Sequence, residues 1–183
     1  LALVFTVGAV WAGITIGAPS LAKLAAEKLP DSVEETLGVQ TLATLDKVYF
    51  SPSKLDEAKQ KEVSATFERI NRSLKRDKKI ELVFRHGDKI GANALALPSG
   101  TVIVTDELVN LAKNQEELFA VLSHEAGHIL HHHPLRGWLQ DSMVALIVAT
   151  IASDASSLSV LAAGLPTALL NAKHSREFET EAD

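Results

Sequence analysis

The chain has 183 residues, of which 18 are Lys or Arg and 23 are Asp or Glu, so its formal net charge is −5 with histidine neutral. This length suffices for one domain with a core of its own, and a content of 46% hydrophobic and 22% charged residues excludes a disordered or collagen-like chain. The mildly acidic balance, without a dense Lys/Arg block, gives no electrostatic support for nucleic-acid binding. The chain has no cysteine, which excludes disulfides, thiolate zinc ligands and a cysteine nucleophile within these residues.

The N-terminal segment is apolar and carries no charged side chain before Lys23. About 18 or more such residues are enough to span the core of a bilayer. We therefore expect residues 1–18 to form a transmembrane anchor, with the hydrophobic core of a signal peptide and a buried helix as the alternatives. Because the sequence does not begin with Met, we also expect an upstream extension.

Residues 19–53 are expected to form a linker with short amphipathic helices, one over residues 20–29 and others around Gly38. A long amphipathic helix is predicted from Lys54 to about Leu74, because apolar residues recur there at helical spacing. Residues 80–84, 94–97 and 102–105 read as strands, the last two joined by a turn at residues 98–100. The sequence therefore predicts an α+β fold that is mainly helical, with a small sheet.

The second half is predicted to be helical. Asp106 is the expected N-cap of a helix over residues 107–113, and Asn114 that of a helix from Glu116 to about His132, which Pro134 would end. Two apolar helices, 135–153 and 155–172, are predicted to form a hairpin. Its arms are short and its tip is polar, which favours a soluble or membrane-dipping hairpin over a pair of spanning helices.

The strongest motif is His-Glu-Ala-Gly-His at residues 124–128, an H-E-x-x-H pattern on a predicted helix. Positions i and i+4 lie on one helix face, so His124 and His128 can place two imidazole nitrogens on one zinc ion. The Glu125 carboxylate then lies where it can reach a metal-bound water. The alternative is a buried helix whose histidines only form hydrogen bonds, which leaves Glu125 without a role.

The histidines that follow this motif do not supply the third ligand that a zinc site needs. His132 lies about 12 Å from His124 along a helix axis, too far to bind the same ion. The run His131–His133 is therefore interpreted as basic residues in the last turn of a helix, where positive charge complements the helix dipole.

The candidate third ligand lies on a short acidic helix near the end of the sequence. Its carboxylates belong to Glu177, Glu179, Glu181 and Asp183. Glu179 and Asp183 are four residues apart and share a helix face, so one can bind zinc while the other orients a ligand histidine. The alternative is an acidic face in contact with solvent. No helix stop signal precedes the end of the sequence, so we expect a fragment of a longer protein.

Taken together, His124–His128 and Ser175–Asp183 resemble the HtpX-like and CAAX prenyl endopeptidases of the Ste24 type, which are gluzincin zinc metallopeptidases of metallopeptidase family forty-eight. Asn93–Gly100 and the residues after it resemble the substrate-side strand region of that family. The resemblance covers roughly residues 55–183. It implies a zincin-like core with an H-E-x-x-H active-site helix in a peptidase domain at residues 54–183. The oxyanion-stabilising side chain of the family has no match before Asp183, so this domain is expected to be truncated at its C-terminus.

The resemblance also implies a role for each matching residue. His124, His128 and Glu179 would bind one Zn²⁺ per chain, Glu125 would be the general base, and Asp183 would orient a ligand histidine. A substrate peptide would be held as an added strand against the edge strand formed by Asn93, Ala94, Leu95, Ala96 and Leu97.

The expected function is therefore that of a zinc metalloendopeptidase in membrane-linked protein quality control. Its expected partners are unfolded or misfolded polypeptides and, through the N-terminal helix, membrane lipid; nucleic acid is not expected. The expected location is a bacterial inner membrane, with the peptidase domain on an unassigned side. The alternative is a catalytically silent chaperone-like or binding module that keeps the fold, and the presence of Glu125 favours the enzyme.

Overall fold

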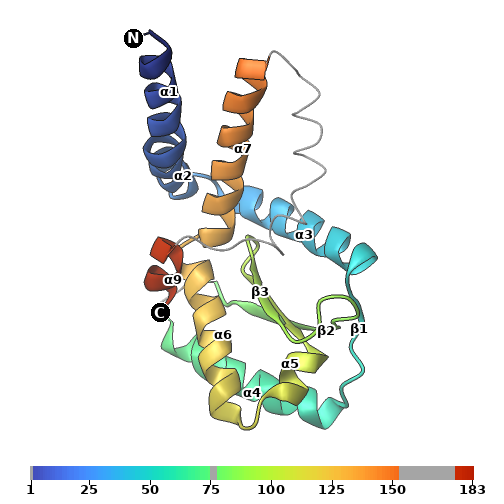
Figure 1. The fold of residues 1–183 in the computed structure, drawn as a ribbon. Helices are drawn as coiled ribbons and strands as arrows, with labels where there is room; N and C mark the ends of the chain where they lie inside the picture. Colours follow the sequence, from blue (N-terminus) through green and yellow to red (C-terminus); the bar gives the residue numbers. More distant parts are fainter. Residues whose placement is uncertain (1, 75–77, 153–175) are drawn as a thin grey trace. The chain divides into compact units, whose positions relative to one another are not determined.

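The computed structural model describes residues 2–74, 78–152 and 176–183, which fall into two compact units (Figure 1). The first unit comprises residues 1–30 and 134–173, and the second comprises residues 31–133 and 174–183. The described residues of the first unit are helical apart from a short turn before residue 31, whereas the second unit contains the sheet. The chain is thus mainly helical with a small mixed sheet and an N-terminal apolar helix, as expected.

The first unit begins with one nearly continuous run of helix, in the order α1 (Ala2–Ala12), η1 (Gly13–Gly17) and α2 (Ala18–Ala26). Pro19 lies in the first turn of α2, where its missing N–H removes no helical hydrogen bond. The amphipathic helix expected to begin near residue 20 is therefore a continuation of the apolar helix. Residues Val4–Ala26 make a helix of 23 residues that is long and apolar enough to cross a membrane, by length and composition.

The second unit contains a four-stranded sheet with the order β1-β2-β4-β3. Its strands are β1 (Ser51–Pro52), β2 (Glu81–His86), β3 (Ala94–Leu97) and β4 (Thr101–Thr105). β2 and β4 are parallel, while β3 pairs with β4 as an antiparallel hairpin. The three predicted strands are confirmed, and β1 was missed because two residues that include a proline give no strand pattern.

Two helices cover the core of the second unit. The predicted amphipathic helix is α4 (Glu57–Ser73), which begins after the N-cap Asp56 rather than at Lys54. It packs against α6 (Gln115–Leu130), and both helices contact the sheet. Asn114 caps α6 as predicted, since its side chain accepts a hydrogen bond from the Glu117 amide. The buried side chains between these elements include Val63, Phe67, Ile70, Val102, Val104, Leu118, Leu122 and Ala126.

The prediction of several short helices around Gly38 is wrong, because residues Asp31–Val48 form one helix, α3. A Cβ atom built on Gly38 would lie 2.3 Å from the Cβ atom of Ser99, in the turn between β3 and β4. The glycine therefore permits a close approach of the helix to the hairpin and does not interrupt the helix.

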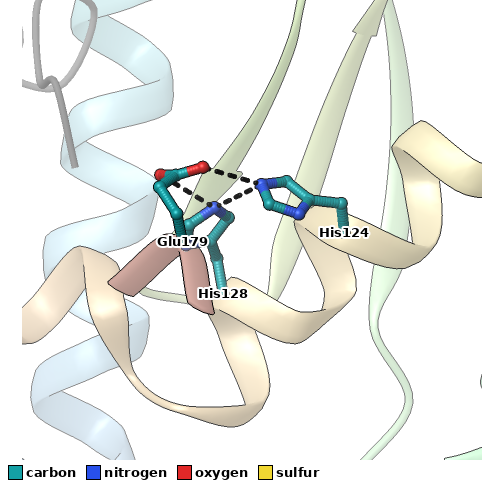
Figure 2. Close-up of side chains that lie close together, drawn as sticks. All are labelled: His124, His128 and Glu179. Atoms are coloured by element: carbon teal, nitrogen blue, oxygen red, sulfur yellow. Dashed lines mark hydrogen bonds and ion pairs between the residues drawn. The ribbon is translucent and has the colours of Figure 1, made fainter. Parts of the chain in front are cut away.

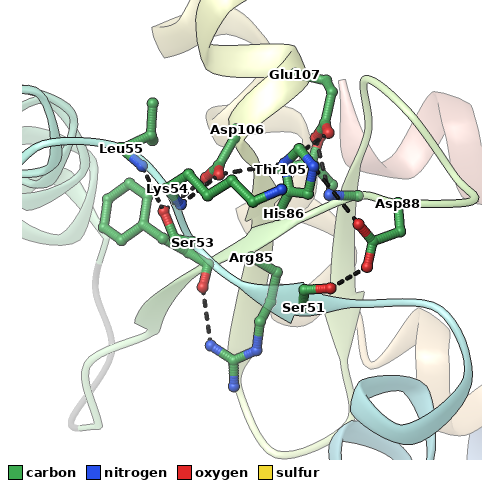
Figure 3. A network of polar contacts seen from close by, with 12 residues as sticks. Ser51, Ser53, Lys54, Leu55, Arg85, His86, Asp88, Thr105, Asp106 and Glu107 are labelled. Atoms are coloured by element: carbon green, nitrogen blue, oxygen red, sulfur yellow. Dashed lines mark hydrogen bonds and ion pairs between the residues drawn. The ribbon is translucent and has the colours of Figure 1, made fainter.

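The predicted cap of α5 (Asp106–Leu111) is also wrong by one residue. Thr105 is the N-cap, with its hydroxyl accepting from the Leu108 amide. Asp106 is only 3% exposed and accepts hydrogen bonds from the Ser53 hydroxyl at 2.6 Å and the Lys54 amide at 2.7 Å (Figure 3). A buried carboxylate needs such partners, and these bonds fix the segment that joins β1 to α4.

The end of α6 differs from the prediction in a way that matters for the site. The helix ends at Leu130 instead of His132, and His132 adopts a left-handed conformation with φ 53°. Pro134 does not end this helix but lies in the first turn of the next, α7 (His133–Ala152). The second arm of the expected hairpin, residues 155–172, lies outside the described residues.

Candidate metal centre

His124 and His128 lie on one face of α6, one turn apart. Their Nε2 atoms face each other at 3.0 Å, with the two rings nearly perpendicular (Figure 2). His128 is buried and His124 is partly exposed. The helical spacing that the sequence indicated therefore places two ring nitrogens at one point beside the helix.

A carboxylate from a distant part of the chain completes this group. Glu179 lies on α9 (Arg176–Ala182), with its oxygens 3.2 Å from Nε2 of His124 and 3.8 Å from Nε2 of His128. Figure 2 shows the carboxylate above both rings. One donor atom from each of the three side chains lies within 4.8 Å of the others, close enough to hold a metal ion. Within residues 2–74, 78–152 and 176–183, this is the one such group of three or more His, Cys, Asp or Glu side chains.

Close packing fixes α9 against α6. A Cβ atom built on Gly127 would lie 2.3 Å from the carbonyl oxygen of Ala182, so only glycine allows the two helices this approach. Phe178, one turn before Ala182 on α9, is buried and stacked on the ring of His133 at 4.3 Å between centroids. Gly127, between the two motif histidines, thus lets α9 approach α6 closely enough to place Glu179 beside them.

Each histidine is held on its Nδ1 side by a further side chain. Nδ1 of His124 lies 2.8 Å from Oδ1 of Asp183, the carboxylate that the sequence indicated for such a role. Nδ1 of His128 lies 2.9 Å from Nδ1 of His133, and Nε2 of His133 lies 2.8 Å from Glu181. The interpretation of His133 as a basic residue in the last turn of α6 is wrong, since α6 ends at Leu130 and His133 is 0% exposed at the start of α7.

Glu125 lies beside this group and contacts the strand β3. Its Oε2 atom accepts a hydrogen bond from the backbone amide of Ala96 at 3.0 Å. Burial raises the pKa of the Glu125 carboxyl to about 7, against the opposing effects of His124 and of the Ala96 amide, and the charge of Glu179 adds to the rise. A carboxyl with a pKa near neutrality can both accept and release a proton under physiological conditions.

The donor set fits a zinc ion. Two imidazole nitrogens and one carboxylate oxygen are typical ligands of catalytic zinc sites, in which a fourth position stays open. Ligand atoms about 2.0–2.1 Å from a tetrahedral ion lie about 3.3–3.4 Å apart. Here the two Nε2 atoms are 3.0 Å apart, one Glu179 oxygen lies 3.2 Å from His124 and the other lies 3.8 Å from His128.

Comparison with known proteins identifies the family. The model of peptidase family M48 matches residues 57–183, so the chain belongs to that family. The chain is also similar to the mitochondrial metalloendopeptidase OMA1 of Arabidopsis thaliana, with 28% identity over 129 residues, 62% of this chain and 25% of that relative. The matched part of the chain spans about a quarter of the length of this relative. The resemblance seen in the two sequence motifs is thereby confirmed at the level of the family.

Proposed function

We propose that this chain, as a member of peptidase family M48, forms part of a zinc metalloendopeptidase with a zincin-like core, in which α6 is the active-site helix. The observation that supports this most directly is the convergence of His124, His128 and Glu179 beside Glu125. The first three residues would hold one zinc ion. When bound, zinc supplies a Lewis acid that polarises the scissile carbonyl and makes water a stronger nucleophile.

Glu125 is the general base in this proposal. Its carboxylate takes a proton from the attacking water and later delivers it to the leaving amine, and a pKa near 7 suits both steps. Asp183 holds His124 through Nδ1, which directs Nε2 toward the metal. A catalytically silent binding module would not need Glu125, so its presence favours the enzyme.

The substrate strand is proposed to be Asn93–Leu97. β3 lies at one end of the sheet order, and one of its amides already contacts the proposed base. A polypeptide added as a further strand along this edge would pass the metal centre with its backbone hydrogen-bonded to β3. Unfolded or misfolded polypeptides are the proposed substrates because they can adopt this extended conformation.

The membrane is the proposed location. Residues 1–18 are proposed as the anchor, residues 19–53 as the connection and residues 54–183 as part of the peptidase domain. Val4–Ala26 supplies a helix of sufficient length, and its exposed apolar residues include Val4, Phe5, Val7, Trp11 and Ile16. A role in membrane protein quality control follows from this anchor and from the proposed substrates, and a bacterial inner membrane is the proposed setting.

Metal analysis and a cleavage assay test the proposal. Full-length protein in detergent should contain about one zinc per chain, and a chelator should abolish cleavage of an unfolded protein such as casein until zinc is restored. Glu125→Gln should keep zinc but lose about 10²–10⁴-fold in kcat, because an amide cannot accept the proton. Glu116→Gln, an exposed change on the same helix, is the matched control. Absence of zinc after reconstitution would refute the proposal, and bound zinc without cleavage would favour the silent module.

A further inference from the structure

We infer that His133 and Glu181 are positioning residues that set which ring nitrogen of His128 is free to bind the metal. This inference rests on the proposed function, because it concerns the orientation of one of the proposed zinc ligands. It concerns two residues for which the sequence motifs gave no role.

The three side chains form one linear chain of contacts. Nδ1 of His128 lies 2.9 Å from Nδ1 of His133, and Nε2 of His133 lies 2.8 Å from Oε2 of Glu181. His128 and His133 are both buried, with exposed fractions of 1% and 0%. Polar atoms at such depth need hydrogen-bond partners, so these contacts constrain where the ring protons lie.

The carboxylate determines the direction of every bond in this chain. An ionised Glu181 can only accept, so Nε2 of His133 must carry the proton and donate it. Nδ1 of a neutral His133 then has a lone pair and accepts from the Nδ1–H of His128. That leaves Nε2 of His128 unprotonated, and this is the atom that lies 3.0 Å from Nε2 of His124 and 3.8 Å from Glu179.

The opposite arrangement is incompatible with the contacts. If Nδ1 of His133 donated to His128, Nε2 of a neutral His133 would present a lone pair to the Glu181 carboxylate at 2.8 Å. The proton of a neutral His128 would then lie on Nε2 and block the metal position. A neutral histidine that binds metal through one nitrogen donates from the other, and such a partner fixes both its tautomer and its ring orientation.

The local backbone explains how His133 reaches this position. His132 adopts φ 53°, a left-handed conformation typical of the residue that follows a helix, and this ends α6 directly before His133. The ring of His132 is held by Glu34 of α3 at 2.5 Å between Nδ1 and Oε1. Phe178 stacks on His133 with an interplanar angle of 4°, which fixes the plane of its ring.

α9 and the residue that follows it thereby supply three carboxylates with separate tasks. Glu179 faces the two histidines, Asp183 holds His124, and Glu181 holds His128 through His133. The Asp183 side chain is 77% exposed whereas that of His133 is 0% exposed, so the support of His128 is the better shielded from water. We therefore expect the His133–Glu181 pair to affect metal affinity at least as strongly as Asp183.

Two substitutions at residue 133 separate hydrogen bonding from shape. His133→Phe keeps a flat ring on Phe178 but removes both polar atoms, whereas His133→Gln keeps an acceptor for His128 and a donor for Glu181. In full-length protein, His133→Phe should weaken zinc binding, measured by competition with a chromophoric chelator, about 10–100-fold. His133→Gln should recover binding to within a few-fold of wild type. His131→Phe keeps a ring beside His133, where the exposed imidazole now stacks at 5.5 Å between centroids, and should leave binding unchanged.

Ring-nitrogen NMR of metal-free wild-type protein with ¹⁵N-labelled histidine gives a readout that needs neither zinc nor folding of a variant. We expect His128 to carry a proton on Nδ1, hydrogen-bonded to His133, and an unprotonated Nδ1 of His128 would overturn the inference. Unchanged zinc affinity in His133→Phe, or equal weakening in His133→Gln and His133→Phe when both fold as wild type, would also overturn it. A wild-type protein that binds no zinc would instead refute the proposed function, while the NMR result would still decide the inference.

Discussion

The candidate metal centre and the N-terminal helix depart from the usual distribution of residues in opposite ways. Around the candidate metal centre, polar side chains such as His128 and His133 are buried. In α1, large apolar side chains are exposed, with Val4 76% and Phe5 80% accessible. Buried polar groups and exposed apolar patches are the informative exceptions in a folded protein, because each raises the free energy unless a partner compensates.

The two regions therefore indicate two kinds of partner. In the proposed function, a cation would compensate the imidazoles whose Nε2 atoms converge with a carboxylate. Lipid would compensate the exposed apolar side chains along the helix of 23 residues. Each of the following experiments changes one feature of these two regions and compares the result with a reference chain.

The largest effect is expected from the third proposed ligand. Glu179→Gln should weaken zinc binding by more than about 100-fold, beyond the effect of a residue that only orients a ligand, because a neutral amide is a poor replacement for the carboxylate. Glu177→Gln, two residues away on the exposed side of α9, should leave zinc in place. Zinc content after dialysis measures both, and retention of the metal by Glu179→Gln would show that the helix register assigned here is wrong.

Membrane binding should depend on the middle of the N-terminal helix. Ile16→Arg introduces a charge near the centre of Val4–Ala26, which costs about 2.5–3.5 kcal/mol in a bilayer core and should lower partitioning into vesicles about 100-fold. Val39→Arg, a comparably exposed site on α3, is the control. Flotation of the full-length protein with phospholipid vesicles measures the difference. Equal flotation of Ile16→Arg and wild type would contradict a membrane role for this helix.

The metal-free protein should become less stable as pH rises through the range set by Glu125. The pKa of this carboxyl is about 7 in the folded protein against 4.5 as the reference value, so the folded state holds the proton longer than the unfolded state. Stability should therefore fall between about pH 4.5 and 7, by up to about 3 kcal/mol relative to Glu125→Gln. Urea unfolding of both chains across this range, with chelator present, checks the prediction. A constant difference between the two chains at all pH values would show that the carboxyl is not perturbed.

The smallest effect is expected from a substitution that disturbs the contact between α6 and α9. Gly127→Ala places a methyl group against the backbone carbonyl of Ala182, which cannot move without shifting α9, so we expect a loss of about 1–3 kcal/mol in stability together with weaker zinc binding. Gly137→Ala, on α7, has no described atom within 4 Å of its added Cβ and should be neutral or slightly stabilising. Thermal unfolding and zinc titration of the two variants test whether this close approach positions Glu179.

The sequence by itself determined the features that depend on local periodicity. The spacing of His124 and His128 defines one helix face, the alternation over residues 80–84 indicates a strand, and Asn114 caps α6 as predicted. These results depend only on helix and strand repeats and on capping by nearby side chains, which act within a few residues of the chain. The pairing of Glu179 with Asp183 was likewise visible from its spacing.

Only the tertiary structure decided the positions that depend on distant segments. Gly38 was predicted to separate short helices but packs against Ser99. Asp106 was predicted to be a cap but accepts from Ser53, and His133 was predicted to lie in the last turn of a helix but is buried. The deciding partners lie 61 residues from Gly38, 53 from Asp106 and, at Glu181, 48 from His133. A local sequence pattern cannot reveal such a partner. The packing of one element against another determines which polar group is buried and which partner hydrogen-bonds to it.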